Sequence, residues 1–590
     1  MLATLVLAAA VAATPTPSPT PSEIGRVTTS DRQEEPLRAA ARTTFVVTKD
    51  EMVRRGSLSV ADAIAQVPGV SLSRYGPSGA LVDVYLRGAG PSQVLVLLDG
   101  RPIGGAQTGT IDLGIMPTAG LERIEIVEGS GATLYGTGAI GGVINLLTAP
   151  QPGESPRLML GGGSLGERDV AFEGRNLSFE RHLATNAYRP NSDMQATSGT
   201  LRVPFRLGVF DAYANAGLRT QAVGVPGPVD FESLTSRQNT LDAQAFFRLQ
   251  RASAHATTSL ELSGTRSQLL FSSNPDDPNG CSCYVLNVEG RLQASMRQEL
   301  RSERNRFVAG IDAARGSARI DAGDGNPPTK GFAQTAIYAQ DSYLAGNARF
   351  YAGVRAERDG GYGGSLAPSL GTVARLTGDL TLRANYATGF RAPTILDLYY
   401  PGFSNPNLRP ERTNGGDVRL TSDAILGGLS LGWFFMNGVD LIAPTADFTT
   451  VVNIQKASLA GLTLDARTPP LHGISATLGI VDLYRALDLT TTATRLPRRP
   501  VFTVNGGIEY QAVSRAARLV ALGILSASVG ERDPGGGAPA YSRIDAYARI
   551  RVARDAIVSL RGYNLGGERY AEVPGYPLPG RALRIDLSNR

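Results

Sequence analysis

The chain has 590 residues, of which 42% are hydrophobic and 19% are charged, and its formal net charge is +5. This composition is typical of a folded protein, and the length admits several ordinary domains or one small domain beside a large all-β unit. Acidic residues are interleaved with the basic ones and no run of five basic residues occurs, which argues against nucleic-acid binding.

The first 44 residues predict a leader and a linker. Residues 1–13 are apolar and end in Val11-Ala12-Ala13, which is typical of a signal peptide, although no Lys or Arg precedes the apolar run. Prolines alternate through residues 14–21 and predict an extended spacer, and the polar, flexible linker continues to residue 44. Elsewhere no apolar stretch approaches the ~20 residues that a transmembrane helix needs, so any membrane crossing would have to use strands.

Residues 45–150 predict a compact mixed α/β domain. A strand is expected at 45–48, then a helix capped by Asp50, and then an amphipathic helix over 59–66 that Pro68-Gly69 ends. Three short apolar runs predict further strands, at 82–86, 94–98 and 124–127.

Glycines mark two turns of this domain. Asp99-Gly100 is a hairpin signal, and the glycine-rich run 136–142 permits positive φ and a close backbone approach. A phosphate-binding loop is disfavoured there, because no Gly-Lys-Ser/Thr follows the run.

After residue 156 the hydrophobic pattern has a period of two to the end of the chain. In residues 543–552 apolar side chains alternate with polar ones, and the runs 201–207 and 583–588 repeat the pattern. Alternation with arginine-rich inner faces over roughly 430 residues predicts an antiparallel transmembrane β-barrel of about 22 strands, each a ~10-residue segment. The expected fold is therefore mostly β, with residues 151–590 forming the barrel and the small domain lying in its lumen.

Two cysteines, Cys281 and Cys283, stand one residue apart in a polar loop. They are too few for a disulfide scaffold and lack further metal ligands nearby. A local disulfide and two reduced thiols both remain open.

Several segments carry a family resemblance. They are Leu81-Val-Asp-Val-Tyr-Leu-Arg-Gly-Ala-Gly, Val94-Leu-Val-Leu-Leu-Asp-Gly-Arg-Pro and residues 124–145, followed by 386–393, 405–411, 564–570 and 580–581. In this order and spacing, across residues 24–588, they resemble the plug and barrel of TonB-dependent outer-membrane receptors. Within that family, residues 68–79 and 104–113 look most like the cobalamin (vitamin B12) receptors.

The resemblance implies TonB-dependent import of a scarce metal chelate across the outer membrane of a Gram-negative-type bacterium. Cobalamin is the first expectation and a ferric siderophore the alternative. Haem is disfavoured because neither the plug nor residues 391–407 contain a histidine that could bind its iron. A passive pore or adhesin is the alternative of another class, and the plug argues against it.

An enzyme is not expected, because none of the three histidines lies in a nucleophile motif. The family resemblance implies no required cofactor. The implied partners are TonB with its inner-membrane complex, the chelate ligand, outer-membrane lipid and the barrel assembly machinery. The chain is expected to act as a monomer.

The resemblance also assigns a segment to TonB and residues to the ligand. The TonB box is expected at Ile24, Gly25, Arg26, Val27, Thr28 and Thr29. Such an extended segment can add a strand to a partner's sheet edge, whereas the alternative is a plain linker. Ligand contacts are expected at Tyr75, Ser78, Gln107 and Thr108, which could otherwise be ordinary polar loop tips.

Charged residues supply two further expectations. Ion pairs that seat the plug in the barrel are expected among Arg87, Arg123, Glu125, Glu128, Arg391 and Glu411, with Arg87 or Arg123 meeting Glu411. Calcium could bind in two acidic loops through Asp276, Asp277, Asp321 and Asp324, and solvated acidic loops are the alternative.

Overall fold

The fold was obtained as a computed structural model. It describes residues 26–30, 32, 34–104, 109–148, 155–186, 188–274, 276–277, 284–321, 329–400, 403–445, 449–490, 493–512, 518–532 and 538–589. The expected signal peptide, the proline-rich spacer and the pair Cys281 and Cys283 lie outside these residues.

A closed antiparallel β-barrel dominates the described part of the chain and contains 22 strands, which confirms the expected fold class. The barrel closes where β10 (Arg157–Gly163) pairs with β34 (Ala582–Ser588), with Leu160 opposite Leu587. The other strands, in chain order, are β11 (Arg168–Glu173), β12 (Leu177–Ala184), β13 (Met194–Leu207), β14 (Phe210–Gly224), β15 (Arg237–Ala252), β16 (Ala256–Ser272), β17 (Tyr284–Arg301), β18 (Asn305–Asp321), β19 (Thr329–Ala345), β20 (Ala348–Asp359), β21 (Gly363–Arg375), β22 (Leu380–Arg391), β23 (Glu411–Ser422), β24 (Leu429–Pro444), β25 (Val451–Arg467), β26 (Ile474–Asp488), β28 (Phe502–Gln511), β29 (Leu519–Val529), β30 (Tyr541–Ala553) and β31 (Ala556–Tyr563).

Short elements lie in the longer connections between barrel strands. They are α5 (Ile395–Tyr399), β27 (Thr494–Arg495), β32 (Ala571–Val573) and β33 (Tyr576–Pro577). Within the described residues, no helix is long and apolar enough to cross a membrane.

The barrel wall is apolar outside and polar inside. On β34, Leu583 and Leu587 are 62% and 47% exposed on the outer face, whereas Arg584 between them is 3% exposed inside the lumen. This is the alternation that the sequence predicted. The strands are longer than the expected ~10-residue segments, because the barrel continues beyond an apolar band of that height; β17 has 18 residues.

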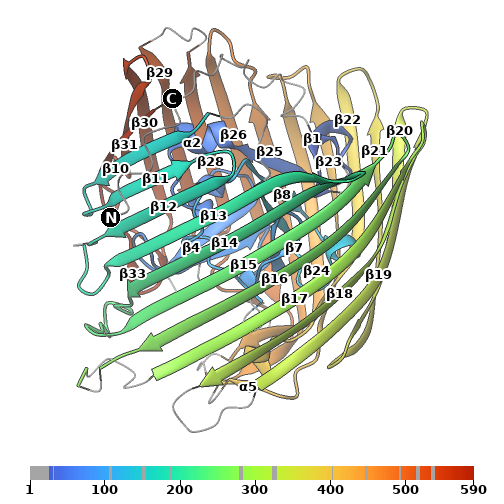
Figure 1. Cartoon of the computed structure of the whole chain (residues 1–590), viewed down its shortest axis with the longest axis horizontal. Coiled ribbons are helices and arrows are strands. Elements are labelled where there is room, and N and C mark those ends of the chain that lie inside the picture. Colours follow the sequence, from blue (N-terminus) through green and yellow to red (C-terminus); the bar gives the residue numbers. More distant parts are fainter. Residues whose placement is uncertain are drawn as a thin grey trace.

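The plug, blue in Figure 1, lies inside the space that the barrel strands enclose. Its five-stranded sheet has the order β3-β8-β9-β6-β7, in which only β6 and β9 run parallel. These strands are β3 (Thr44–Thr48), β8 (Arg123–Glu128), β9 (Gly142–Leu147), β6 (Val94–Leu98) and β7 (Arg101–Pro102). A separate hairpin joins β4 (Val70–Arg74) to β5 (Val82–Leu86), and β1 (Arg26–Val27) pairs with β2 (Glu35–Pro36).

The helices of the plug are short, and one begins differently from the prediction. They are η1 (Leu37–Ala39), α2 (Lys49–Arg55), α3 (Val60–Ile64), η2 (Pro91–Gln93) and α4 (Ala132–Tyr135). Thr48, and not Asp50, caps α2, because its hydroxyl accepts a hydrogen bond from the Glu51 amide at 3.3 Å. The expected helix over 59–66 is confirmed over the shorter span of α3, where Ser59 and Asp62 form a capping box.

Turn chemistry and packing explain the plug's compactness. Asp99 and Gly100 take positive φ values of 49° and 83°, as the hairpin between β6 and β7 requires. Side chains from the helices and both sheets form one apolar core, whose fully buried members include Ile64, Leu86 and Ile124. The plug is thereby a packed body that can present loops to both ends of the lumen.

Candidate functional site: the plug apex, the plug–wall pocket and the N-terminal hairpin

Tyr75 stands at the tip of the β4–β5 hairpin, in a cluster of aromatic and charged side chains that we call the apical cluster. Its hydroxyl donates to Asp83 at 3.2 Å and accepts a hydrogen bond from Arg498. Its ring meets the ring of Tyr576 edge-on, with the centroids 5.1 Å apart. Burial, with Asp83 adding to it, raises the pKa of Tyr75, so the phenol stays protonated.

Ser78, in the same loop, is tied to the barrel wall. Its Oγ lies 3.1 Å from Nε2 of His182 on β12, and His182 contacts Asp169 on β11 through Nδ1. Ser78 therefore links the plug to the wall beneath the apex, while Tyr75 points into the apical cluster. The other two expected ligand residues, Gln107 and Thr108, lie outside the described residues.

Two arginines of the apical cluster were missed by the sequence analysis. Arg498 and Arg499 lie in the connection between β27 and β28; Arg498 takes a φ of 61°, and the Arg499 guanidinium lies 5.4 Å from the ring centroid of Tyr85. Arg499 also donates from Nε to the Gly88 carbonyl at 2.8 Å. The proline-flanked pair Pro497-Arg-Arg-Pro500 was the available signal, because it predicts a rigid loop that carries positive charge.

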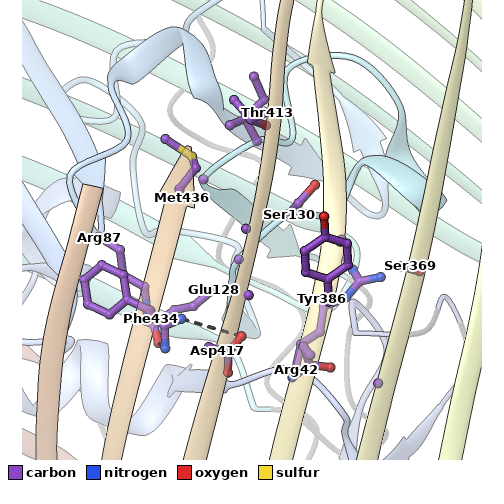
Figure 2. A pocket seen from close by; sticks show the side chains of 18 of the residues that line it. Arg42, Arg87, Glu128, Ser130, Ser369, Tyr386, Thr413, Asp417, Phe434 and Met436 are labelled. Carbon is purple, nitrogen blue, oxygen red and sulfur yellow. Dashed lines mark ion pairs between the residues drawn. The ribbon is translucent and has the colours of Figure 1, made fainter. Parts of the chain in front are cut away.

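A pocket of about 750 Å³ separates the plug from the barrel wall, and we call it the plug–wall pocket (Figure 2). The plug contributes Arg42, Arg87, Glu128 and Ser130, and strands β19 to β24 form the facing wall. Many lining residues on both sides are glycine, alanine or serine, so few large side chains interlock across the pocket. Charged side chains bridge the gap.

Arg87 makes the plug-to-barrel ion pair in this pocket. Its guanidinium lies 2.6 Å from Glu128 within the plug and 3.8 Å from Asp417 on β23, and it covers the ring of Phe434 at 4.9 Å. Figure 2 marks the pair with Asp417 by a dashed line. Burial raises the pKa of Glu128, and the charge of Arg87 opposes that shift.

Glu411 is not the partner of Arg87 or Arg123, which corrects the expected pairing. Its carboxylate pairs with Arg391 at 2.6 Å within the barrel, and the plug reaches it through an amide donated by Gln93 at 3.0 Å. The reason is topological, because β22 and β23 place Arg391 directly opposite Glu411.

Arg123 and Glu125 also stay within the plug. Arg123 Nε lies 2.8 Å from Glu125 Oε1, and both side chains belong to β8. The second oxygen of Glu125 accepts hydrogen bonds from the amides of Thr28 and Thr29 at 3.0 and 2.8 Å. Glu125 therefore holds the N-terminal segment and does not meet the barrel.

The N-terminal hairpin, residues 26–36, lies inside the lumen and includes four of the six expected TonB-box residues. Val27 and Thr29 are fully buried, and Thr29 Oγ1 accepts a hydrogen bond from Asn145 at 2.9 Å. Tyr135 donates to the Thr29 carbonyl at 3.0 Å. Residues 27–29 thus pack against the plug sheet. Ile24 and Gly25 lie outside the described residues.

Arg32 anchors the turn of this hairpin to the barrel. Its guanidinium lies 3.4 Å from Asp312 on β18 and 4.6 and 4.7 Å from the ring centroids of Tyr135 and Tyr338. Its backbone φ of 54° is unusual for a residue other than glycine. A buried cation between a carboxylate and two aromatic faces is a specific anchor.

In the acidic loops, the carboxylates of Asp277 and Asp321 bind other groups of the protein. Asp277 accepts hydrogen bonds from the Ser233 hydroxyl at 2.7 Å and the Thr235 amide at 3.0 Å, and Asp321 pairs with Arg319 at 3.2 Å. Asp276 is exposed beside Asp277. The described residues contain no group of three or more His, Cys, Asp or Glu side chains that could hold a metal ion, and Asp324 lies outside them.

A 22-stranded barrel with a plug in its lumen defines the class of large, plugged outer-membrane barrels. A family model described as "TonB dependent receptor-like, beta-barrel" matches residues 133–565, and one described as "TonB-dependent Receptor Plug Domain" matches residues 36–143. The chain belongs to the TonB-dependent receptor family and is a protein of the Gram-negative outer membrane.

Curated relatives include proteins named vitamin B12 transporter BtuB. The one from Photobacterium profundum is 28% identical over 75% of each chain, and one from Vibrio cholerae is 23% identical over 95% of this chain and 94% of the relative.

Similar solved structures show the fold alone, because their sequence identities are low. A copper transporter, OprC, has a TM-score of 0.79 at 16% identity and covers 92% of this chain and 98% of its own. The siderophore receptor PirA of Acinetobacter baumannii has a TM-score of 0.75 at 15% identity with the same coverage.

Proposed function

We propose that this receptor imports cobalamin, or a closely related corrinoid, across the outer membrane. The observation that carries the proposal is the apical cluster, where Tyr75 of the plug meets Arg498 and Tyr576 of the barrel loops. Flat aromatic faces and guanidinium groups suit a large ligand with amide, ring and phosphate groups. The relatives named as vitamin B12 transporters support the same choice.

Energy coupling would act through the N-terminal hairpin. Residues 24–29 would add a strand to TonB, for which residues 26–29 would leave the lumen and exchange the β1–β2 pairing for pairing with the partner. Pulling on this segment would strain its bonds to Glu125, because the Thr28 and Thr29 amides both bind that carboxylate. Since Glu125 lies on β8, inside the five-stranded sheet, the pull would reach the core of the plug.

The plug–wall pocket would be the place where the plug parts from the barrel. Small residues line both surfaces there, and the Arg87–Asp417 pair at 3.8 Å spans them. A buried ion pair fixes position while contributing little net stability, which suits a plug that is seated and then released.

We further propose a domain division with a signal peptide at 1–13, a linker at 14–44, the plug at 45–150 and the barrel at 151–590. The receptor would work as a monomer without a cofactor, inserted by the barrel assembly machinery. The passive pore is disfavoured by the plug's packed core and its many bonds to the wall.

Equilibrium binding of cyanocobalamin and of a panel of ferric siderophores to the purified receptor tests the substrate. We expect submicromolar cyanocobalamin binding, weakened about tenfold or more by Tyr75→Ala, since an aromatic anchor of a binding site contributes more than 1 kcal/mol. Thr388→Ala, on β22 away from the apical cluster, is the control. Submicromolar binding of a siderophore without corrinoid binding would exclude cobalamin.

A ferric siderophore is the second candidate, and the pair Arg498 and Arg499 favours it. Two guanidinium groups at the apex would attract an anionic chelate. In the same experiment this candidate predicts that Arg499→Gln weakens siderophore binding steeply and that the loss grows at low salt.

A further inference from the structure

The outer wall of the barrel has an apolar groove that the import function does not use. It has a volume of about 1190 Å³ and crosses strands β19 to β24, and we call it the wall groove. Outward-facing side chains of these strands line it, among them Phe350, Leu370, Tyr386 and Trp433, which are 52%, 62%, 46% and 41% exposed. Because this surface faces the membrane in an outer-membrane barrel, lipid is its natural neighbour.

Small residues form the floor of the wall groove and aromatic residues form its sides. Ala352 and Ala384 line the groove and face outward between larger neighbours. Trp433 stacks on Phe435 with centroids 5.3 Å apart and donates from Nε1 to the Tyr484 hydroxyl at 2.9 Å. These rings are held in place, so the groove is a formed feature of the wall.

The groove lies toward the periplasmic end of the barrel. Its residues lie near the short connections 346–347, 376–379 and 423–428. The connections at the other end of the barrel include the long segments 392–410 and 564–581. Outer-membrane barrels have short turns at the periplasmic side and long loops outside the cell. The wall groove therefore faces the inner leaflet, which consists of phospholipid.

One carboxylate lies at the edge of this apolar surface. Asp341 on β19 faces outward, between Phe307 and Ala352 on the neighbouring strands. Asn305 donates to its Oδ2 at 3.0 Å, and its Oδ1 is buried with no hydrogen-bond partner among the described residues. A charge on the lipid face is destabilising, although less for Asp than for Arg or Lys and less near the interface than at mid-membrane. A cation from the membrane would offset that cost.

We propose that the wall groove binds one phospholipid of the inner leaflet that carries a primary ammonium head group, as phosphatidylethanolamine does. An acyl chain would lie on the floor at Ala352 and Ala384, between the aromatic side chains. The ammonium group would meet Asp341, whose negative charge attracts a cation. A head group with a net negative charge and no ammonium could not make this contact. The site is independent of the imported ligand.

Native mass spectrometry of the purified receptor tests this site. The receptor is incubated with equal amounts of phosphatidylethanolamine and phosphatidylglycerol that have the same acyl chains. We expect one phosphatidylethanolamine to be retained several-fold over phosphatidylglycerol. Asp341→Asn should bring that ratio close to one, and Ala352→Leu, which fills the floor, should lower retention of both lipids.

Ala356→Leu is the matched control, because Ala356 is an exposed alanine farther along β20 and does not line the groove. Heat-modifiability on gels checks that every variant keeps a folded barrel. Equal retention of the two lipids by the unaltered receptor would overturn the proposal. So would an unchanged ratio in Asp341→Asn, or an equal effect of Ala352→Leu and Ala356→Leu.

Discussion

Arg87 combines a strained backbone with a bridging side chain. It follows the last residue of β5 with a φ of 50°, a region that residues other than glycine rarely adopt. The conformation aims its guanidinium at Glu128 and, across the plug–wall pocket, at Asp417. Strain of this kind costs on the order of 1–3 kcal/mol and persists where surrounding contacts hold it.

Asp417→Asn should loosen the plug without unfolding the barrel. The substitution removes the barrel's charge and leaves Arg87 with Glu128, so we expect a loss of about 1 kcal/mol in the free energy that seats the plug. Ion conductance of single receptors in planar bilayers, measured against urea concentration, reports plug release. The urea concentration at which half of the receptors have released the plug should be lower for Asp417→Asn than for the unaltered receptor.

Asp359→Asn is the control, because this luminal carboxylate accepts hydrogen bonds from Gln334 and Gly361 of the barrel. If both variants release the plug at the same urea concentration as the unaltered receptor, the seating role of Asp417 is wrong.

Asp112 gives the plug a pH dependence. Burial raises its pKa from 3.8 to about 7, although it accepts hydrogen bonds from the amides of Gly114 at 2.8 Å and Val82 at 3.1 Å. A carboxyl group with a raised folded-state pKa holds more protons in the folded state than in the unfolded state. Its contribution to stability is therefore full below about pH 4 and is lost as the pH rises toward 7.

Asp112→Asn removes that titration while keeping an oxygen acceptor for both amides. Hydrogen exchange at Val82 and Gly114, corrected for the intrinsic rate, should show more protection in the variant than in the unaltered receptor at pH 8. The two proteins should differ little at pH 4.5. A constant difference across this range would contradict the titration of Asp112.

At the scale of elements, the N-terminal hairpin joins the plug sheet to the barrel. Glu125 binds the Thr28 and Thr29 amides just after its first strand, and Arg32 anchors its turn beside Asp312. If this segment is the TonB box, as proposed, its release to TonB would require both contacts to break. The stability of the hairpin would then set how often the segment is available to TonB.

Arg32→Ala should free this hairpin. It leaves Asp312 paired with Arg355 at 2.7 Å but removes the contacts of the Arg32 guanidinium with Asp312 and with the ring of Tyr338, and we expect a loss of roughly 1–3 kcal/mol. Faster hydrogen exchange at the Thr28 and Thr29 amides would report this loss of stability. Arg26→Ala is the control, since the Arg26–Glu34 pair is exposed and such pairs contribute about 0–1 kcal/mol. Equal exchange in both variants would refute the anchor.

Local patterns predicted the elements better than the contacts between them. The bounds of β5 and β6 agree with the expected runs 82–86 and 94–98, because each is an apolar run between turn residues. The cap of α2 was misplaced by two residues, since both Thr48 and Asp50 have side-chain oxygens suited to capping.

The sequence pattern could not predict contacts between site residues that lie far apart in the chain. Glu125 binds a segment 96 residues away, and Arg498 reaches Tyr75 across 423 residues. Neither spacing nor periodicity reports such contacts. Tyr75 could be chosen because residues 68–79 resemble a segment of the cobalamin receptors, whereas its partners required the folded barrel.

At the scale of the whole molecule, a polar lumen surrounds a plug with its own apolar core. Arginine-rich inner faces let the wall bind the plug through hydrogen bonds and ion pairs, as Arg202 does at the Gly120 carbonyl with 2.8 Å. Such contacts are individually modest and can be exchanged for water. The architecture therefore combines a closed barrel with a plug that is held through separable polar contacts.

Uptake of radiolabelled cyanocobalamin by cells that lack their own outer-membrane cobalamin receptor tests the proposed function most directly. Cells expressing this chain should accumulate the label when TonB is present. They should fail to do so without TonB or when residues 24–29 are deleted, although the deletion variant should still bind cyanocobalamin at the cell surface. Equal uptake with and without residues 24–29, or no uptake by the unaltered chain, would contradict TonB-driven corrinoid import.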